Sequence, residues 1–108
     1  MARIPSTTRN ALPWVADEVD SLALGAGTAE SWTAPAGTVA VAIKYSAGVL
    51  WMRKTTTAVV PTTEVTNGSA AEMILQGQEF QVSEDDELSF INATACQVCI
   101  VRLRVNSQ

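Results

Sequence analysis

After residue 20 the sequence consists of short runs of strand-forming residues separated by turn residues. In residues 38–46, larger apolar side chains alternate with alanine, lysine and serine, as in a strand with one buried face. No part of the sequence keeps the 3.6-residue apolar period of an amphipathic helix. The spacing therefore predicts an all-β domain.

The pattern indicates eight strands, and 108 residues suffice for one domain. The strands are expected at residues 21–24, 29–33, 38–46, 49–54, 73–75, 79–82, 88–92 and 96–105. Ala47-Gly48 is the strongest hairpin signal, and the polar connection 55–72 leaves room for an edge strand at 58–60. Short strands at this spacing predict an antiparallel β-sandwich that is jelly-roll-like in topology.

Residues 1–20 differ from the rest, because they hold two prolines and sustain neither the helical nor the strand period. We expect an extended N-terminal arm over residues 1–20 and a β-sandwich domain over residues 21–108. A disordered tail, or a short helix at 14–20, are the alternatives. Trp14, with Leu12 and Val15 beside it, is a candidate anchor for a partner's pocket.

The composition narrows the function classes. Histidine is absent, so no Ser-His-Asp triad, Cys-His dyad or His-ligated metal site is expected. Seven basic residues against eleven acidic ones argue against binding nucleic acid through its phosphates. Apolar runs fall short of the roughly 18 residues that a membrane span needs. We therefore expect no enzyme activity, no cofactor, no nucleic-acid partner and no membrane partner.

Cys96 and Cys99 form a Cys-x-x-Cys pair, a spacing found in redox and zinc sites. Here the pair lies in a strand-like segment, where residues three apart point to opposite faces and their Cα atoms are about 10 Å apart. A disulfide needs Cα atoms within about 7 Å. We expect two small buried thiols instead.

Two strands are apolar on both faces, at residues 49–52 and 98–101. A single sandwich has one interior layer, so either Leu50 or Trp51 must face outward. We expect other subunits or the arm to cover such faces, although alanine-rich faces can also tolerate water. Arg102 and Arg104 are expected to share one face, where they either solubilise it or pair with acidic residues across an interface. The predicted partner contacts are Leu12, Trp14, Val15, Leu50, Trp51, Arg102 and Arg104.

Two further clusters carry a functional and a structural interpretation. The acidic run at residues 84–87 lacks the ligand spacing of a calcium loop, so we expect a solvated hairpin turn that could meet a partner's basic patch. The aromatic residues could form a sugar-binding platform, but each sits among apolar strand neighbours, so core packing is the expectation. They are Trp32, Tyr45, Trp51, Phe80 and Phe90.

Several short motifs bear a family resemblance. A strand carrying Trp32 precedes Pro35-Ala36-Gly37 and an apolar strand, and similar elements follow at 49–53, 58–61, 76–78 and 88–91. Over residues 21–105 this arrangement resembles small β-sandwich virion proteins of tailed bacteriophages. The resemblance implies a structural, non-enzymatic head decoration (cement) protein that binds the capsid surface and stabilises it.

The same resemblance implies a homo-oligomer, a trimer or dimer, whose arm contacts the shell. Its partner would be the major capsid protein or another virion protein, and its location the virion, assembled in the host cytoplasm. A tail, neck or fibre-associated virion protein is the alternative, followed by a carbohydrate-binding module.

Overall fold

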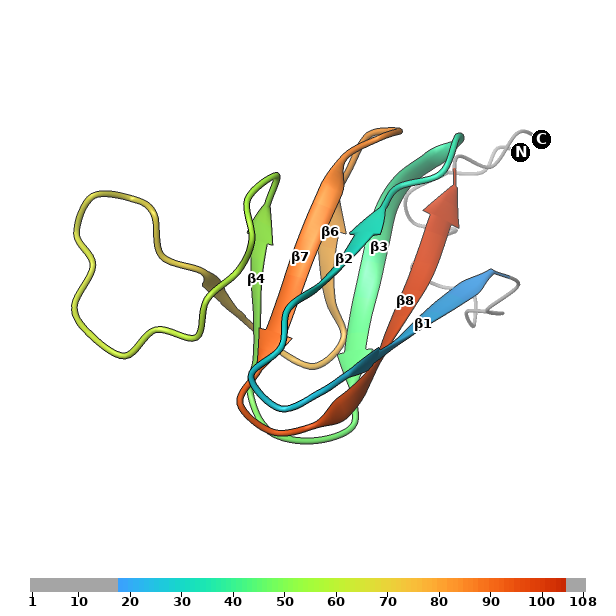
Figure 1. Ribbon diagram of the computed structural model, residues 1–108. Coiled ribbons are helices and arrows are strands. Elements are labelled where there is room, and N and C mark those ends of the chain that lie inside the picture. The colour runs from blue at the N-terminus through green and yellow to red at the C-terminus, as the bar shows by residue number, and fades with distance from the viewer. Residues whose placement is uncertain (1–17, 105–108) are drawn as a thin grey trace, which may run out of the picture.

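The structure, a computed structural model, describes residues 18–104, apart from the Arg104 side chain. The predicted arm contacts Leu12, Trp14 and Val15 lie outside the described residues. Eight strands form this part of the chain (Figure 1). They are β1 (Val19–Leu24), β2 (Glu30–Thr33), β3 (Thr38–Tyr45), β4 (Leu50–Lys54), β5 (Glu72–Ile74), β6 (Gln78–Gln81), β7 (Glu87–Asn92) and β8 (Cys96–Arg104).

The strands form two four-stranded sheets, and every pairing is antiparallel. Sheet 1 has the order β1-β8-β3-β6, and sheet 2 has the order β2-β7-β4-β5. Every connection except β4–β5 passes from one sheet to the other. The predicted all-β architecture is confirmed for the described residues, and its two sheets are consistent with a sandwich.

The predicted strand positions are close to the observed ones, with two differences. β1 begins at Val19, inside the predicted arm, because Val19 and Asp20 pair with Val101 and Ile100 of β8. The edge strand considered at 58–60 does not form. There the backbone N–H of Ala58 donates to a side chain of β7 instead of a strand partner, as described below.

The predicted hairpin at Ala47-Gly48 is wrong, because β3 belongs to sheet 1 and β4 to sheet 2. The turn is held at both sheets. The backbone N–H of Ser46 donates to the Gln97 carbonyl at 3.0 Å, and Asn92 Nδ2 donates to the Ala47 carbonyl at 2.8 Å. The turn therefore carries the chain from one sheet to the other, and Gly48 adopts a φ of 68° within it.

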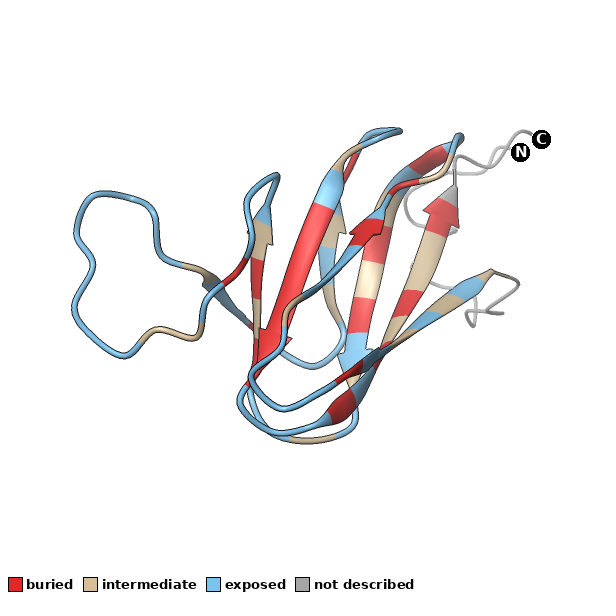
Figure 2. Ribbon diagram, in the orientation of Figure 1, coloured by how far each residue is buried: buried red, intermediate tan, exposed pale blue. Residues whose placement is uncertain are grey.

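The core lies between the two sheets and is built from alternate residues of their strands. β7 is the exception, since its last five residues are all buried (Figure 2). A strand buried on both faces needs cover outside the sandwich as well as inside. Each fully buried aliphatic or aromatic side chain stabilises the fold by about 1.5–3 kcal/mol. The largest fully buried apolar side chains are Phe90, Ile43, Leu50, Ile74, Leu88, Ile100, Val41 and Val98.

Candidate functional site

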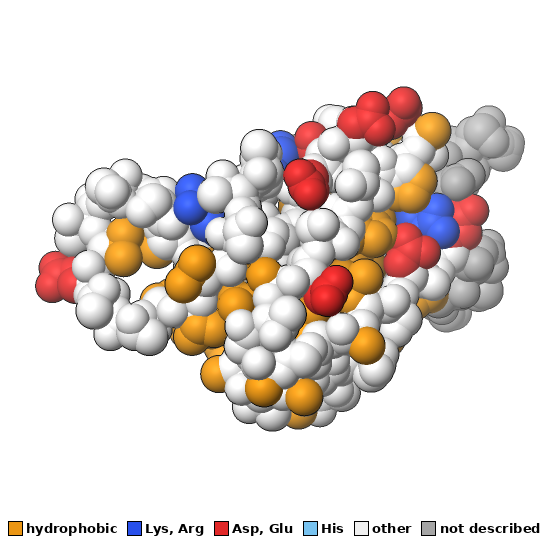
Figure 3. Space-filling model, viewed as in Figure 1, with side chains coloured by type: hydrophobic (Ala, Val, Ile, Leu, Met, Phe, Trp, Pro, Cys, Tyr) orange, Lys and Arg blue, Asp and Glu red, His pale blue; other side chains and the backbone are white. Residues whose placement is uncertain are grey.

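The outer face of sheet 2 carries a block of large apolar side chains. Trp51 pairs with Met73 on one side and with Ile91 on the other. Because side chains alternate along a strand, Val49 and Leu75 continue the same face by two residues from Trp51 and Met73. We call these five residues the outer patch. Figure 3 shows hydrophobic side chains gathered on this side of the molecule, near β4 and β5.

Much of the outer patch is open to water. Leu75 is 66% exposed, Met73 51% and Val49 43%, while Trp51 is half-buried and Ile91 is buried. Among the described residues, five of the seven exposed large hydrophobic side chains lie between positions 49 and 75. A contiguous exposed apolar surface marks a contact site more often than scattered residues do.

The structure separates the two predicted contacts on β4. Leu50 points into the core with an exposure of 0%, so its side chain offers no surface to a partner. Trp51 faces outward, which confirms the prediction that one of these two residues would do so. The tryptophan is therefore the residue of this pair that a partner can reach.

The β4–β5 connection, residues 55–71, lies beside the outer patch. Its first part is tied to β7, since the Thr55 N–H donates to the Glu87 carbonyl at 2.8 Å and the Ala58 N–H to Ser89 Oγ at 2.9 Å. Ala58 thereby covers the outer side of β7 and is 1% exposed. Beyond this point the chain leaves the sheets as a wide loop, and every residue from 62 to 70 is exposed (Figures 1 and 2).

Arg102 does not take the predicted outward position. It pairs in register with Val41, a core residue, and its Nη2 lies 3.1 Å from Asp20 Oδ1. The other carboxylate oxygen of Asp20 accepts a 2.6 Å hydrogen bond from Trp32 Nε1. Asp20 thus links β8 and β1 of sheet 1 to β2 of sheet 2, and Arg102 serves this internal contact. The Arg104 side chain lies outside the described part.

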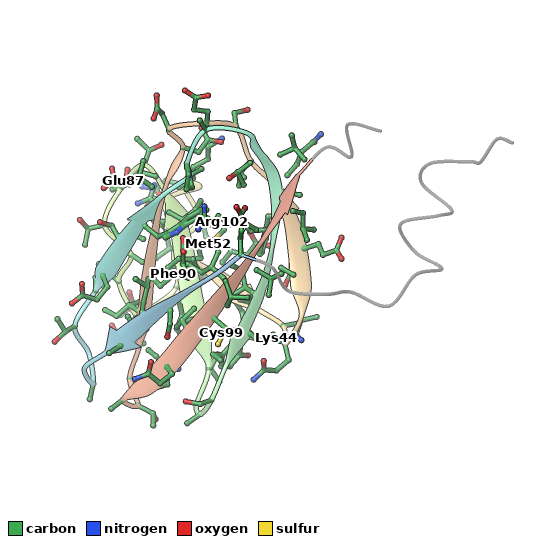
Figure 4. All side chains as sticks on the ribbon, turned by 90° about the vertical axis from the view of Figure 1, so that its right-hand side faces the viewer. Lys44, Met52, Glu87, Phe90, Cys99 and Arg102 are labelled. Atoms are coloured by element: carbon green, nitrogen blue, oxygen red, sulfur yellow. The ribbon has the colours of Figure 1, made fainter. Side chains whose placement is uncertain are left out.

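The outer face of sheet 1 carries smaller side chains. Ala42 pairs with Val101, and Lys44 pairs with Cys99. Figure 4 shows Lys44 and Cys99 next to each other. Cys96 points the other way and is buried, so the prediction of opposite faces is confirmed. The prediction of two buried thiols holds for Cys96 only, because Cys99 lies on the outer face and is half-buried. Burial raises the pKa of the Cys96 thiol, which keeps it protonated at neutral pH. Both cysteines are free thiols.

The acidic run forms the turn between β6 and β7, which lie in different sheets, so it is not a hairpin. Asp86 closes the turn by accepting the Ser83 N–H at 2.8 Å, and Lys54 Nζ lies 3.2 Å from the same Oδ2. The backbone hydrogen bond from Ser83, with a smaller contribution from Lys54, lowers the pKa of Asp86. Within residues 18–104 no group of three or more carboxylate or cysteine side chains is placed to hold a metal ion.

The predicted core packing of the aromatic residues holds for most of them. Trp32 and Phe90 are buried, and Tyr45 and Phe80 are half-buried against the core. Trp51 alone among them lies on an outer face. The described part of the chain also contains no helix long and apolar enough to cross a membrane.

Two surface depressions accompany these features. One, of about 210 Å³, lies between β2 and the start of the β4–β5 connection and is lined mainly by Ser, Thr and Glu side chains. The other, of about 370 Å³, lies where the edges of the two sheets approach each other, with Met52, Phe80, Val82 and Leu88 lining it beside Arg53 and Glu72.

Comparison with known proteins adds no relative. No family model matches the chain, and no match was found among curated proteins or solved structures. The function is therefore argued from the surfaces described above and from the resemblance in the sequence.

Proposed function

We propose that this protein is a structural component of a tailed-phage virion, a decoration (cement) protein that binds the head shell and stabilises it. The outer patch around Trp51 carries the proposal. It places large apolar side chains on a surface that the described chain leaves open, where a protein partner would remove them from water. A part whose work is to join other subunits needs such a surface rather than a catalytic cleft.

The strand order supports the finer topology that the proposal includes. A jelly roll is a double-sheet arrangement of eight strands built from two Greek keys. The order β1-β8-β3-β6 facing β2-β7-β4-β5, with nearly every connection crossing between sheets, fits that arrangement. We propose that the sandwich is jelly-roll-like and that residues 1–18 form the arm preceding it.

The mechanism of stabilisation would be mass action. A protein that binds the assembled shell better than its separate subunits stabilises the shell by the free energy of that binding. In this scheme Trp14, with Leu12 and Val15, anchors the arm on the shell, and the sandwich bridges neighbouring capsid subunits as an oligomer. The partner is the major capsid protein, and the protein resides in the virion.

The test is decoration of empty heads assembled without the protein. Purified protein is added, unbound protein is removed by sedimentation, and the heads are then exposed to heat and to low salt. We expect bound protein at a fixed number of copies per head and greater resistance to both treatments. Trp14→Ala should weaken binding, while Ala16→Gly, a change in the same segment without loss of a large side chain, should not.

Heads that are equally robust with and without the protein would contradict the proposal. Imaging of the decorated particle separates the head from the alternative location at the tail, neck or fibre. Retention on a polysaccharide column, with no binding to heads, would instead favour the carbohydrate-binding alternative.

A further inference from the structure

The loop beyond Ala58 has an unusual shape for a domain of this size. Connections longer than about 12–15 residues without secondary structure are uncommon in compact domains and usually serve a function. Residues 61–71, which we call the projecting loop, extend away from both sheets (Figure 1). Val65 is 41% exposed within it, and Val59, just before it, is 67% exposed. The loop therefore carries apolar side chains that its own domain leaves in water.

The projecting loop nevertheless has a formed tip. Asn67 Oδ1 accepts the Ser69 N–H at 3.1 Å and the Ser69 hydroxyl at 2.6 Å, and Gly68 adopts a φ of 86°. An Asn side chain bonded to the backbone two residues on mimics a backbone turn. A loop with such a turn loses less conformational freedom on binding than an unstructured one would.

The charges on the loop and beside the outer patch are complementary. Glu64 is the only charged residue of the projecting loop. Arg53 follows Trp51 on the outer side of β4 and is half-buried. Within the described residues the Arg53 guanidinium has no hydrogen bond or ion pair, whereas the Lys54 ammonium pairs with Asp86 and the Arg102 guanidinium pairs with Asp20. One chain therefore presents both halves of an ion pair at the same side of the sandwich, with no internal use for either.

The area of the outer patch is too small for the patch alone to form a stable interface. The patch spans three strands about 4.8 Å apart and about three residues along them, at about 3.3 Å per residue, which covers roughly 140 Å². A stable interface buries about 800 Å² on each partner. The projecting loop is the adjoining surface that can supply the difference, and its Val65, with Val59 just before it, matches the apolar character of the patch.

We infer that the projecting loop of a second copy of this chain covers the outer patch, with Val59 and Val65 on Trp51 and Met73 and with Glu64 paired to Arg53. In a symmetric oligomer each copy gives its loop and receives another, so the same residues supply both sides of the contact. The inference deepens the oligomeric part of the proposed function and rests on it. It names the surface through which the copies join.

The experiment measures the mass of the full chain in solution, without heads, by sedimentation over a range of concentrations. We expect an oligomer that dissociates more readily when residues of the projecting loop or of the outer patch are substituted. Glu64→Arg and Arg53→Glu should each weaken association about tenfold or more, because each places like charges together. The double variant should return to within about threefold of the original chain, since the pair is restored with its signs exchanged.

Control variants separate the contact from general effects of charge. Glu84→Arg makes the same charge change as Glu64→Arg on an exposed residue of the β6–β7 turn, and it should leave the mass unchanged. Met73→Asp should abolish association, while Val19→Asp, at an exposed valine on sheet 1, should not. Thermal unfolding of each variant shows that the domain still folds.

Three outcomes would overturn the inference. They are a monomer at every concentration, association that is indifferent to Glu64→Arg and Met73→Asp, and a double variant no better than either single one. If Trp14→Ala dissociates the oligomer and the loop variants do not, the occupant of the patch is the N-terminal segment. Because heads are absent from this measurement, its failure is distinct from a failure of shell binding.

Discussion

The two connections that flank β4 differ in almost every physical respect. The β3–β4 turn takes only four residues, 46–49, and is fixed to both sheets by hydrogen bonds from its backbone and by Asn92. The β4–β5 connection takes 17 residues, 55–71, and only its first part is tied to the sheets. One connection is bound to its own domain and the other is left largely in solvent.

The two connections nevertheless use the same local chemistry. An asparagine whose side-chain oxygen accepts the N–H two residues on lies beside the first connection, in Asn92–Thr94 at the end of β7, and within the second, in Asn67–Ser69. Each also contains a glycine with positive φ, Gly48 and Gly68. The difference lies in surroundings, since the first set is packed and the second is exposed. Matched substitutions at the two asparagines and the two glycines therefore measure what the packed surroundings add to similar turn chemistry.

The largest difference in stability is expected between alanine variants of the two glycines. Alanine at position 48 would place its Cβ 2.5 Å from Asn92 Oδ1 and 2.9 Å from Thr94 Cβ. Left-handed backbone costs alanine about 1–2 kcal/mol, and displacing Asn92 adds to this, so Gly48→Ala should destabilise the fold by about 3 kcal/mol. Gly68→Ala meets nothing within 4 Å and should cost only about 1 kcal/mol. Urea unfolding at one protein concentration measures both.

A further variant shows whether the crowding is the cause. Asn92→Ala removes the atom that the new methyl group would strike, so Gly48→Ala should cost less in that background than in the original chain. Equal losses of stability for Gly48→Ala and Gly68→Ala would mean that the tight turn is not held as described.

The second largest difference in stability is expected between alanine variants of the two asparagines. Asn92 is 1% exposed, donates to the Ala47 carbonyl and accepts from the Thr94 N–H. Asn92→Ala removes a buried side chain and leaves both backbone groups without these partners in a partly buried site, which should cost about 2 kcal/mol. Asn67→Ala exposes its freed partners to water, and surface changes of this kind usually stay within about 0.5 kcal/mol. The unfolding midpoint in urea compares the two variants.

An Asn67→Ala loss as large as that of Asn92→Ala would show that the projecting loop contributes to the stability of the domain. The comparison is made below the concentration at which copies associate, because partner binding raises apparent stability.

The strand positions could be predicted from the sequence because alternation and turn residues are local signals. Residues 38–46 carry a period of two, and the strand forms there with an error of one residue. The assignment of strands to sheets is not local. The short Ala47-Gly48 turn is equally compatible with a hairpin and with a crossing between sheets. The crossing is held by the hydrogen bond from Asn92 to the Ala47 carbonyl, 45 positions apart in the sequence.

The contacts on the surface were harder to predict for the same reason. That either Leu50 or Trp51 must face outward followed from an apolar run, but which of them does depends on the register with β5 and β7. Arg102 was placed outside because alternation alone does not say which face is the core. The sequence held a signal for the projecting loop, since a long polar connection with a lone glutamate at position 64 is visible there. Arg53 can be recognised as the oppositely charged partner of Glu64 only once the structure shows that Arg53 has no partner within the described part of its own domain.

The smallest expected effect concerns the point where the fixed part of the chain meets the loop. Lys54 ends β4, and its ion pair with Asp86 ties that end to the β6–β7 turn. The pKa of Asp86 is below its ordinary value of 3.8, chiefly through the Ser83 hydrogen bond, so its charged form stabilises the fold. That stabilisation is complete above pH 3.8 and is lost as the pH falls through the lower value in the folded protein.

Asp86→Asn should therefore lower the melting temperature slightly at pH 7, and the difference in melting temperature from the original chain should close as the pH falls below about 4. Asp85→Asn makes the same change of charge at the neighbouring residue, whose positive φ suits asparagine, and so controls for the loss of one negative charge from the turn. A gap for Asp86→Asn that stays constant down to pH 2 would mean that the carboxylate charge does not hold the base of the loop.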